Sequence, residues 1–167
     1  MTDDSCQMTE RAGASTDNCQ LTSDICALQR APDWPTRLDE YIRTARARPF
    51  AWGVNDCCLF ACGAVAAMTG VDPGGWFRGR YRSAFAARLA LRQFAGGGLA
   101  EAIETLAARH GKAEIAPLRA GRGDLCLMGT LDGISGLGVC LGSRAAFMSP
   151  RGLVFAPMGR VARAWRI

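Results

Sequence analysis

The sequence predicts an α+β domain in which helices come first and an antiparallel β-sheet follows. Two observations support this order. Between residues 33 and 110, apolar residues recur at intervals of three and four, which is the period of a buried helical face. After Gly111 the chain changes to short apolar runs separated by glycines, a pattern typical of short strands. We therefore expect N-terminal helices packed on a C-terminal antiparallel sheet.

The first two helices each have a start signal and a stop signal. The first has Asp33 as a cap candidate and Pro35 at an early helical position, and it should end before Pro49. The second begins near Asp56 and ends at Gly70. Its apolar positions predict one buried stripe, formed by Cys57, Phe60, Ala61, Ala64, Val65 and Met68.

The later elements follow from local composition. Residues 71–81 are rich in turn-forming residues and should wrap the surface. A third helix is expected over residues 83–94, where a run of three glycines ends it, and a fourth begins at Leu99. The candidate strands cover residues 114–118, 124–128, 137–141, 145–148, 153–156 and 161–165.

Length and charge divide the chain into an arm and one domain. With 167 residues, of which 49% are hydrophobic, the chain can bury one substantial core. Residues 1–32 are polar and sustain no helical or strand period, so we expect a disordered or lightly docked arm before a domain over residues 33–167. Residues 1–33 have a net charge of −4 and residues 34–167 have a net charge of +9, which together give the +5 of the whole chain.

The basic domain would attract an anionic partner such as a cell-wall polymer, a nucleic acid or an acidic protein face. A basic surface that is simply solvated is the favoured interpretation. Specific nucleic-acid binding is not expected, because no run of basic residues is interleaved with aromatic ones.

The sequence predicts a protein that is made and stays in the cytoplasm, or leaves it by a non-secretory route. The chain contains no run of 18 apolar residues, so no membrane span is predicted. The N-terminus also lacks the basic segment followed by an apolar segment that is typical of a secretory signal. The eight cysteines do not form the pattern of a disulfide framework. Three lie in the arm, three on one helical turn and two in candidate strands: Cys6, Cys19, Cys26, Cys57, Cys58, Cys62, Cys126 and Cys140.

Cys57 occupies a chemically privileged position at the start of the second helix. The free N–H groups and the dipole of a helix N-terminus favour a thiolate, which is the nucleophilic form of cysteine. Asp56 is expected to cap the helix, in preference to an acid–base role. Trp52 and Gly53 should form the loop beside the thiol, with Trp52 as an aromatic wall.

Neither a metal ion nor another cofactor is expected. Zinc takes four ligands, and no Cys-x-x-Cys pair or nearby histidine completes a set with Cys57, Cys58 and Cys62. Helical geometry places Cys58 and Cys62 on the same side of the helix, and it turns Cys57 about 100° away from them.

Three short stretches resemble the NlpC-type cysteine peptidases. Residues 50–60, FAWGVNDCCLF, look like the family's aromatic-Gly loop followed by its Asp-Cys-Ser-Gly-Phe/Leu motif, with Cys57 on the nucleophile. Residues 122–127, RGDLCL, resemble the Gly-Asp-Leu stretch that opens the first core strand. Residues 136–142, GLGVCLG, resemble the family's His-Val-Gly-Ile-Tyr-Leu-Gly strand.

This resemblance implies a papain-like α+β fold of NlpC type, whose members cut peptide links in bacterial cell walls. The overall sequence pattern of the chain, including the terminal AWR stretch at 164–166, resembles that of small NlpC-like proteins encoded in phage and prophage tail-gene regions. That similarity implies tail proteins as partners, a role in tail assembly or host-wall penetration, and a location in the virion.

The chain departs from the family at the general base. Gly136 stands where the family has its catalytic histidine, and residues 144–148 offer no His, Asn or Gln to orient one. The chain has a single histidine, His110, which we expect at a helix C-terminus. Asp124, which follows a glycine at a strand start, is expected to fix a turn. The favoured interpretation of Cys57 is a small apolar residue at a former active site.

Three functions therefore compete. The leading hypothesis is a catalytically degenerate NlpC-like protein, a pseudoenzyme that serves phage tail assembly. The second is an active cysteine hydrolase that cuts an amide or peptide bond of peptidoglycan, using Cys57 and a base from elsewhere. The third is a thiol redox protein that uses Cys57 with Cys58 or Cys62.

Overall fold

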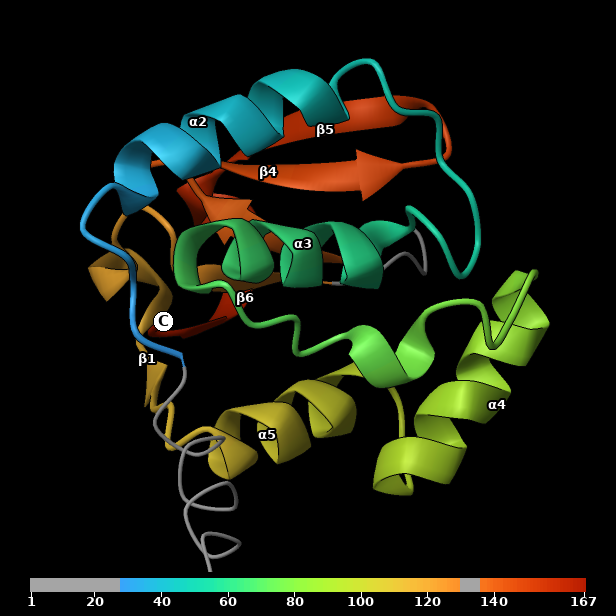
Figure 1. The fold of residues 1–167 in the computed structure, drawn as a ribbon. Helices are drawn as coiled ribbons and strands as arrows, with labels where there is room; N and C mark the ends of the chain where they lie inside the picture. The colour runs from blue at the N-terminus through green and yellow to red at the C-terminus, as the bar shows by residue number, and fades with distance from the viewer. Residues whose placement is uncertain (1–27, 130–135) are drawn as a thin grey trace, which may run out of the picture.

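The computed structural model describes residues 28–129 and 136–167, and in these residues it contains four helices and one six-stranded sheet (Figure 1). The helices are α2 (Trp34–Ala45), α3 (Cys57–Thr69), α4 (Ala84–Ala95) and α5 (Leu99–Arg109). The strands are β1 (Glu114–Ile115), β2 (Leu125–Met128), β3 (Leu137–Cys140), β4 (Arg144–Ser149), β5 (Gly152–Pro157) and β6 (Val161–Trp165). The predicted α+β class, with helices before strands, is confirmed.

The sheet is antiparallel and has the strand order β1-β6-β2-β3-β4-β5. The final strand, β6, lies between β1 and β2, and it pairs Trp165 with both Glu114 and Leu125. The other strands follow one another as a meander from β2 to β5. The C-terminal strand therefore lies next to the β1 edge strand and connects β1 to the meander.

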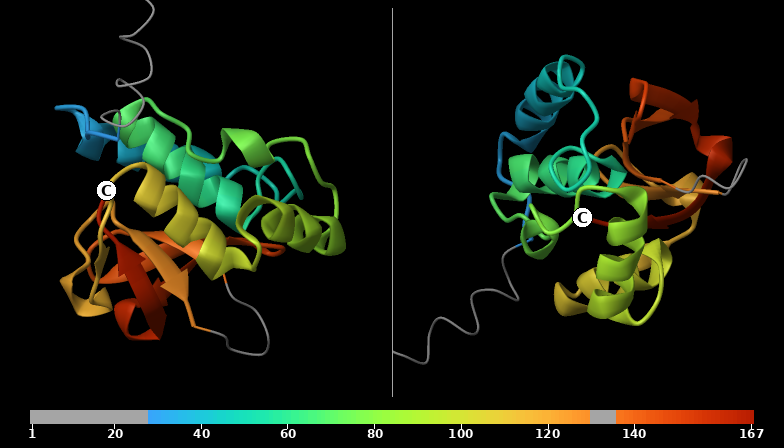
Figure 2. Two further views of the ribbon diagram at one scale, coloured as in Figure 1. Left: turned by 90° about the horizontal axis from the view of Figure 1, so that it is seen from below. Right: turned by 90° about the vertical axis from the view of Figure 1, so that its right-hand side faces the viewer.

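Helix α3 is the central helix of the domain. It lies against the sheet between α2, which covers β4 and β5, and α5, which covers the side of β2 and β6 (Figures 1 and 2). The predicted single stripe was too narrow, because α3 is apolar around most of its circumference and packs on several sides, as expected for a helix inside a core. Its buried residues are Leu59, Phe60, Ala61, Cys62, Ala64, Val65 and Met68.

The opposite face of the sheet is also buried. Strand residues that point away from α3 form a second apolar layer with the short 3₁₀ helices η3 (Pro117–Arg119) and η4 (Met158–Arg160) and their neighbours. Its buried members are Cys126, Cys140, Ala145, Phe147, Ala156, Val161 and Ala164. Cys126 and Cys140 thus serve as small core residues, and both are free thiols.

Several element boundaries differ from the sequence prediction for identifiable reasons. The strand expected over 114–118 ends at Ile115, because Pro117 has no N–H to donate and begins η3 instead. Helix α2, by contrast, ends at Ala45, which agrees with the prediction that it stops before Pro49. Asp33 occupies the N-cap position of α2, yet its side chain makes no capping hydrogen bond and pairs with Arg37 at 2.8 Å.

Residues 71–81 do more than wrap the surface. They include η2 (Gly75–Phe77), and both Phe77 and Tyr81 are buried in a cluster with α4 and α5. An aromatic residue in a turn-rich stretch is therefore part of the core here, which the turn composition alone did not predict.

The chain just before α2 is fastened to the domain. Residues 1–27 of the predicted arm lie outside the described residues, whereas Leu28 is buried beside α5, and its carbonyl accepts a hydrogen bond from Lys112 Nζ at 2.7 Å. The Ala31 N–H donates to the Met68 carbonyl at the end of α3. Residues 28–32 are therefore packed on the domain that follows them.

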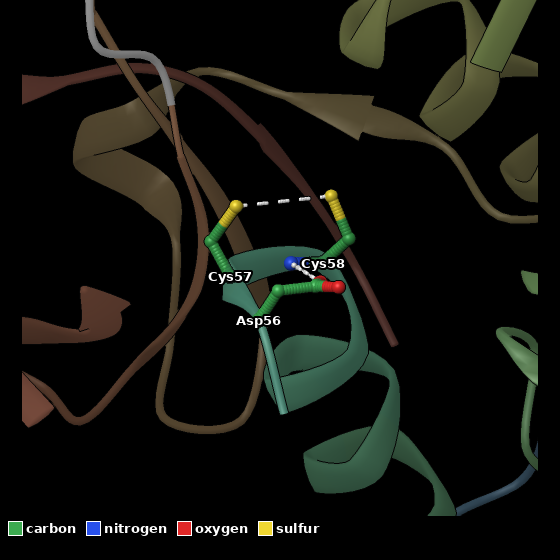
Figure 3. A group of neighbouring side chains, drawn as sticks. All are labelled: Asp56, Cys57 and Cys58. Atoms are coloured by element: carbon green, nitrogen blue, oxygen red, sulfur yellow. Dashed lines mark hydrogen bonds between the residues drawn. The ribbon is translucent and has the colours of Figure 1, made fainter. Parts of the chain in front are cut away.

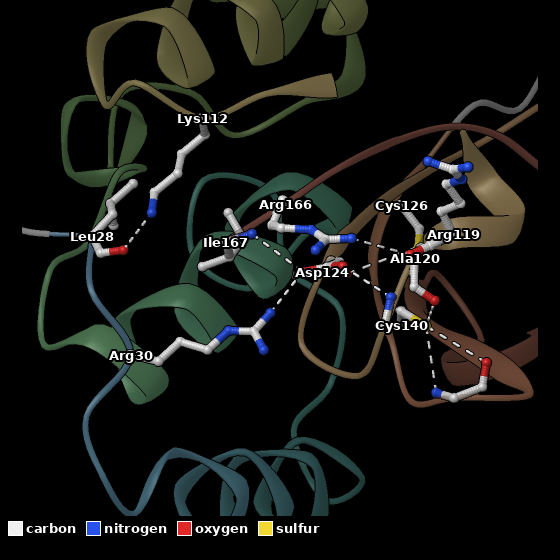
Figure 4. A network of polar contacts seen from close by, with 12 residues as sticks. Leu28, Arg30, Lys112, Arg119, Ala120, Asp124, Cys126, Cys140, Arg166 and Ile167 are labelled. Carbon is white, nitrogen blue, oxygen red and sulfur yellow. Dashed lines mark hydrogen bonds and ion pairs between the residues drawn. The ribbon is translucent and has the colours of Figure 1, made fainter. Parts of the chain in front are cut away.

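A buried carboxylate joins this entry segment to the C-terminal residue. Asp124 Oδ1 accepts from Arg30 at 2.6 Å and from the Ile167 N–H at 3.2 Å, and Oδ2 accepts from the Gly121 N–H at 2.9 Å (Figure 4). The Arg30 guanidinium also lies 4.4 Å from the ring centre of Trp34. Asp124 fixes the predicted turn and adds two long-range contacts.

In the described part of the chain, none of the helices has the length and the apolar character that crossing a membrane requires.

Candidate functional site

A tight loop brings the chain to the start of α3. Gly53 has a φ of 72°, and a Cβ at this position would lie 2.1 Å from the Tyr81 carbonyl oxygen. The Asn55 side chain closes the loop by donating to the Pro49 carbonyl at 2.8 Å. A glycine is required at position 53, because any side chain would meet both a left-handed backbone and the Tyr81 backbone.

Asp56 anchors the loop and caps α3, as predicted. Its Oδ1 accepts from the Cys58 and Leu59 N–H groups at 3.0 Å each. Its Oδ2 accepts from the Gly53 N–H at 2.9 Å and from the Tyr81 hydroxyl at 2.7 Å. Asp56 is 1% exposed, so a buried carboxylate is held entirely by neutral donors and the start of a helix.

Cys57 and Cys58 form a close pair of thiols above the first turn of α3 (Figure 3). Their Sγ atoms are 3.8 Å apart, a distance at which one thiol donates to the other. The predicted angular separation of these two residues did not anticipate this, because side-chain rotation brings the two sulfurs together. Cys62, by contrast, is buried farther along the helix, where it packs against Gly74 and Leu59.

The two thiols differ in acidity. The pKa of Cys57 is lowered, mainly because Cys58 donates a hydrogen bond to it, and the N–H groups of Leu137 and Cys58 act in the same sense. Burial and the negative charge of Asp56 oppose this shift. The pKa of Cys58 is raised well above its usual range by that same hydrogen bond and by burial. Cys57 is therefore the thiol that ionises, with Cys58 as its donor.

Gly136 lies directly against the thiol. A Cβ at position 136 would be 3.7 Å from the Cys57 Cβ, and among the described residues it would meet no other atom within 4 Å. The Gly136 carbonyl accepts from the Met128 N–H at 2.9 Å, which holds this residue at the start of β3. The residue that faces Cys57 from the sheet is therefore a glycine, as the strand motif predicts.

His110 lies at the C-terminus of α5, as predicted. Its N–H donates to the Leu106 and Ala107 carbonyls at 3.2 Å, and its side chain lines a small apolar cavity of about 30 Å³ beneath α5 with Cys62, Leu125 and other residues. Of the described groups that shift the pKa of Cys57, none is a histidine.

Trp52 is half-buried at the other side of the loop. It packs against the cluster that contains Leu59, Phe77 and Tyr81, and its ring meets Phe50 edge-on with ring centres 4.9 Å apart. Its predicted role as a wall beside the thiol stays a prediction.

The ligand atoms of Asp56, Cys57 and Cys58 all lie within 4.8 Å of one another, and they are the one such grouping among the described residues. Each carboxylate oxygen of Asp56 already accepts two hydrogen bonds. Recruiting this carboxylate to a metal would uncap α3 and leave the Tyr81 hydroxyl and the Gly53 N–H without their acceptor. The arrangement therefore suits a capped thiol pair better than a metal centre.

Sequence reasoning missed the contribution of Tyr81. Burial and the neighbouring Asp56 charge raise the pKa of Tyr81, so its hydroxyl stays protonated and donates to Asp56. The isolated aromatic residue in the stretch RGRYRS was the available signal, because a tyrosine amid arginines and turn residues commonly has a buried ring and a hydrogen-bonded hydroxyl.

Comparison with known proteins places this chain by family. No curated protein matches the chain. A family model described as a domain of unknown function, DUF6950, matches residues 29–167, a span that begins with the docked entry segment and includes the thiol loop and the whole sheet. The chain therefore belongs to the DUF6950 family.

Proposed function

We propose that this protein is a catalytically degenerate NlpC-like domain, papain-like in fold, that serves as a structural or assembly component of a phage or prophage tail. The sequence resemblance supports the fold and the tail association. The observation that carries the degenerate part is Gly136, which presents no side chain to Cys57 from the first residue before β3. A glycine cannot take a proton from a thiol or return one to a leaving group.

The rest of the thiol loop supports this interpretation. Asp56, Gly53 and Tyr81 hold the loop through contacts that stabilise the fold whether or not Cys57 reacts. The single histidine of the chain lies at the end of α5 and lines a cavity whose lining residues do not include Cys57. A former active site that retains its scaffold and lacks its base would have these properties.

In this proposal the partners are other tail proteins, and the protein passes from the cytoplasm into the virion. The test is complementation of a phage or prophage whose copy of the gene has been deleted. The proposal expects Cys57→Ala to restore infectious tailed particles as well as wild type does, with the protein detected in purified tails by immunoblotting. Loss of particles with a folded Cys57→Ala protein, or absence of the protein from tails, would contradict it.

A second candidate is an active cysteine hydrolase that acts on peptidoglycan. The observation that favours it is the lowered pKa of Cys57, which gives the thiol nucleophilic character without a histidine. Purified wild-type protein would then release soluble fragments from peptidoglycan sacculi, Cys57→Ala would release none, and Cys62→Ala would serve as the matched control. Equal release by wild type and Cys57→Ala removes this candidate.

A thiol redox function would use the same pair of sulfurs. A disulfide has an S–S distance of about 2.05 Å, so the two sulfurs would have to approach from 3.8 Å and rearrange the first turn of α3. Mass spectrometry after mild oxidation tests this directly. A Cys57–Cys58 bond that forms and reduces reversibly, without unfolding, would favour redox chemistry over both other functions.

A further inference from the structure

A second hollow lies on the far side of the domain from the α4 and α5 helices. It has a volume of about 230 Å³ and is lined by Arg46, Leu141, Ser143, Arg144 and Phe155. These residues come from the end of α2, the β3–β4 turn and the strands β4 and β5, which lie side by side in Figure 1. Three separate segments of the chain therefore build one concave surface.

Two guanidinium groups at this hollow have no carboxylate partner among the residues that the structure describes. Among residues 28–129 and 136–167, neither Arg46 nor Arg144 forms an ion pair. The two acidic side chains of α2 are engaged with other arginines, because Asp39 pairs with Arg122 and Glu40 with Arg43. The positive charge of the hollow is thus left uncompensated by the described residues.

The lining supplies further recognition elements. The Arg46 guanidinium lies 5.3 Å from the centre of the Phe155 ring, which orients its planar donors at the rim. Ser143 adds a hydroxyl in the β3–β4 turn, and Leu141 and Phe155 provide apolar walls. Phe155 is 37% exposed, so part of its side chain is accessible to a ligand.

These features match a particular ligand chemistry. Arginine side chains bind oxyanions through paired N–H donors, and a dianion neutralises two guanidinium charges where a carboxylate neutralises one. We propose that the hollow binds a phosphate monoester, with the phosphate between Arg46 and Arg144 and an apolar or aromatic substituent against Leu141 and Phe155. This site is independent of the thiol loop and of the proposed tail function.

The first test is calorimetric titration of the full-length protein with phenyl phosphate at pH 8, where the phosphate is dianionic. Replacing both arginines in Arg46→Gln/Arg144→Gln should weaken binding by at least about tenfold, because each lost contact is a charge-assisted hydrogen bond. The matched control is Arg88→Gln/Arg92→Gln, which removes the same charge from exposed positions on α4 and should bind within about twofold of wild type.

Two further variants test the planar shape of the guanidinium groups separately from their charge, and test the aromatic wall. The thermal midpoint checks that the fold is intact. Arg46→Lys/Arg144→Lys keeps both charges and loses the planar fork, so its affinity should fall severalfold while its thermal midpoint stays unchanged. Phe155→Ala should weaken phenyl phosphate and leave inorganic phosphate unaffected. Equal losses in the pocket variant and the α4 control would overturn the proposal, as would the absence of wild-type binding both to phenyl phosphate and to the phosphatidic acid vesicles of the next experiment.

The phosphate could belong to a soluble ester or to a lipid headgroup, and a second arm distinguishes them. Co-sedimentation with vesicles of phosphatidic acid in phosphatidylcholine, lost in Arg46→Gln/Arg144→Gln and kept in Arg88→Gln/Arg92→Gln, would assign the headgroup. Binding of phenyl phosphate without co-sedimentation would assign a soluble ester. Either result supports the site, and failure of both arms rejects it.

Discussion

Asp56 and Asp124 are two buried carboxylates with the same local motif and different electrostatic environments. Each accepts the N–H of the glycine three residues earlier, Gly53 or Gly121, at 2.9 Å, and each precedes a core element, α3 or β2. Asp124 is also paired with the Arg30 guanidinium at 2.6 Å, whereas all the donors to Asp56 are neutral.

The difference shows what each turn can do to its surroundings. The charge of Asp124 is balanced by Arg30, so this turn connects distant parts of the chain. The negative charge of Asp56 is stabilised only by neutral hydrogen-bond donors, so it still acts on its neighbours. It contributes to the raised pKa of Cys58 and of Tyr81, and it opposes the lowering of the pKa of Cys57. The carboxylate that builds the thiol loop therefore opposes ionisation of the thiol.

The largest expected effect is that of Asp56→Ala. Removing the cap and leaving the buried Gly53 and Tyr81 donors without an acceptor should lower the free energy of unfolding by about 4 kcal/mol. Urea denaturation measures this. The exposed Asp39→Ala is the control, with an expected loss within about 0.5 kcal/mol. A loss for Asp56→Ala as small as that of the control would show that the capped loop does not stabilise the fold.

Arg30→Met tests the charged partner in the other turn. It should lower the free energy of unfolding by about 3 kcal/mol, because it leaves the Asp124 carboxylate buried without its cation. The double variant Arg30→Met/Asp124→Asn should recover part of this loss in the same urea experiment. Arg37→Met, which breaks an exposed pair with Asp33, is the control. Without any recovery in the double variant, the contribution of Arg30 would be its packing on Trp34 and not its charge.

Tyr81→Phe tests the neutral side of the comparison. It deletes one hydroxyl donor to Asp56 Oδ2 and keeps the ring in its cluster, so the expected loss is about 1.5 kcal/mol. Thermal unfolding with Tyr41→Phe, which removes a hydroxyl donor to the Phe60 carbonyl, gives a scale for an ordinary hydrogen bond. If Tyr81→Phe proves harmless, Asp56 is satisfied by the backbone alone.

The smallest expected effect concerns acidity. Asp56→Asn keeps a capping oxygen and removes the negative charge, so the pKa of Cys57 should move further down, and the pH profile of its alkylation by iodoacetamide should shift to lower pH. Asp124→Asn should leave that profile unchanged. An unshifted profile for Asp56→Asn would mean that the charge of Asp56 is fully screened from the sulfur.

The same measurement ranks the thiols of wild type. Burial raises the pKa of Cys62 and Cys126 to about 12, so both should stay protonated and unreactive at pH 7 while Cys57 reacts. The pKa values of Cys62 and Cys126 are raised and that of Cys57 is lowered, so the two kinds of thiol change the free energy of unfolding in opposite directions as the pH rises. The buried thiols favour the folded state below pH 9, and this contribution is lost as the pH rises toward 12, so alkaline unfolding should begin in that range.

The sequence was most informative where the controlling interactions are local. Periodicity, Asp56 as a cap and Gly70 as a stop predicted α3, and the glycine-separated runs predicted all six strands to within a few residues except β1. The exception has a local cause as well, because Pro117 cannot donate a hydrogen bond to a neighbouring strand and begins a 3₁₀ helix instead.

Contacts between distant residues could not be predicted from pattern alone. Arg30 and Asp124 are separated by 94 positions, and Tyr81 reaches Asp56 across 25. Gly136 was the instructive intermediate case, because the similarity of one strand to a family motif predicted its place opposite Cys57 without any local signal. The approach of the Cys57 and Cys58 sulfurs depended on side-chain rotation, which helical spacing does not specify.

The meeting of Arg30 and Ile167 at one oxygen of Asp124 has a mechanical consequence. A stretching force applied between residues 28 and 167 would load these two contacts together with the hydrogen bonds that join Leu28 to Lys112 and Ala31 to Met68. Asp124 is one of the groups that resist this force, and its two hydrogen bonds would contribute to the tension at which the entry segment detaches from the domain. Optical-trap extension of wild type and Arg30→Met, pulled from these two positions, would show the difference as an early release of a short length of chain at lower force.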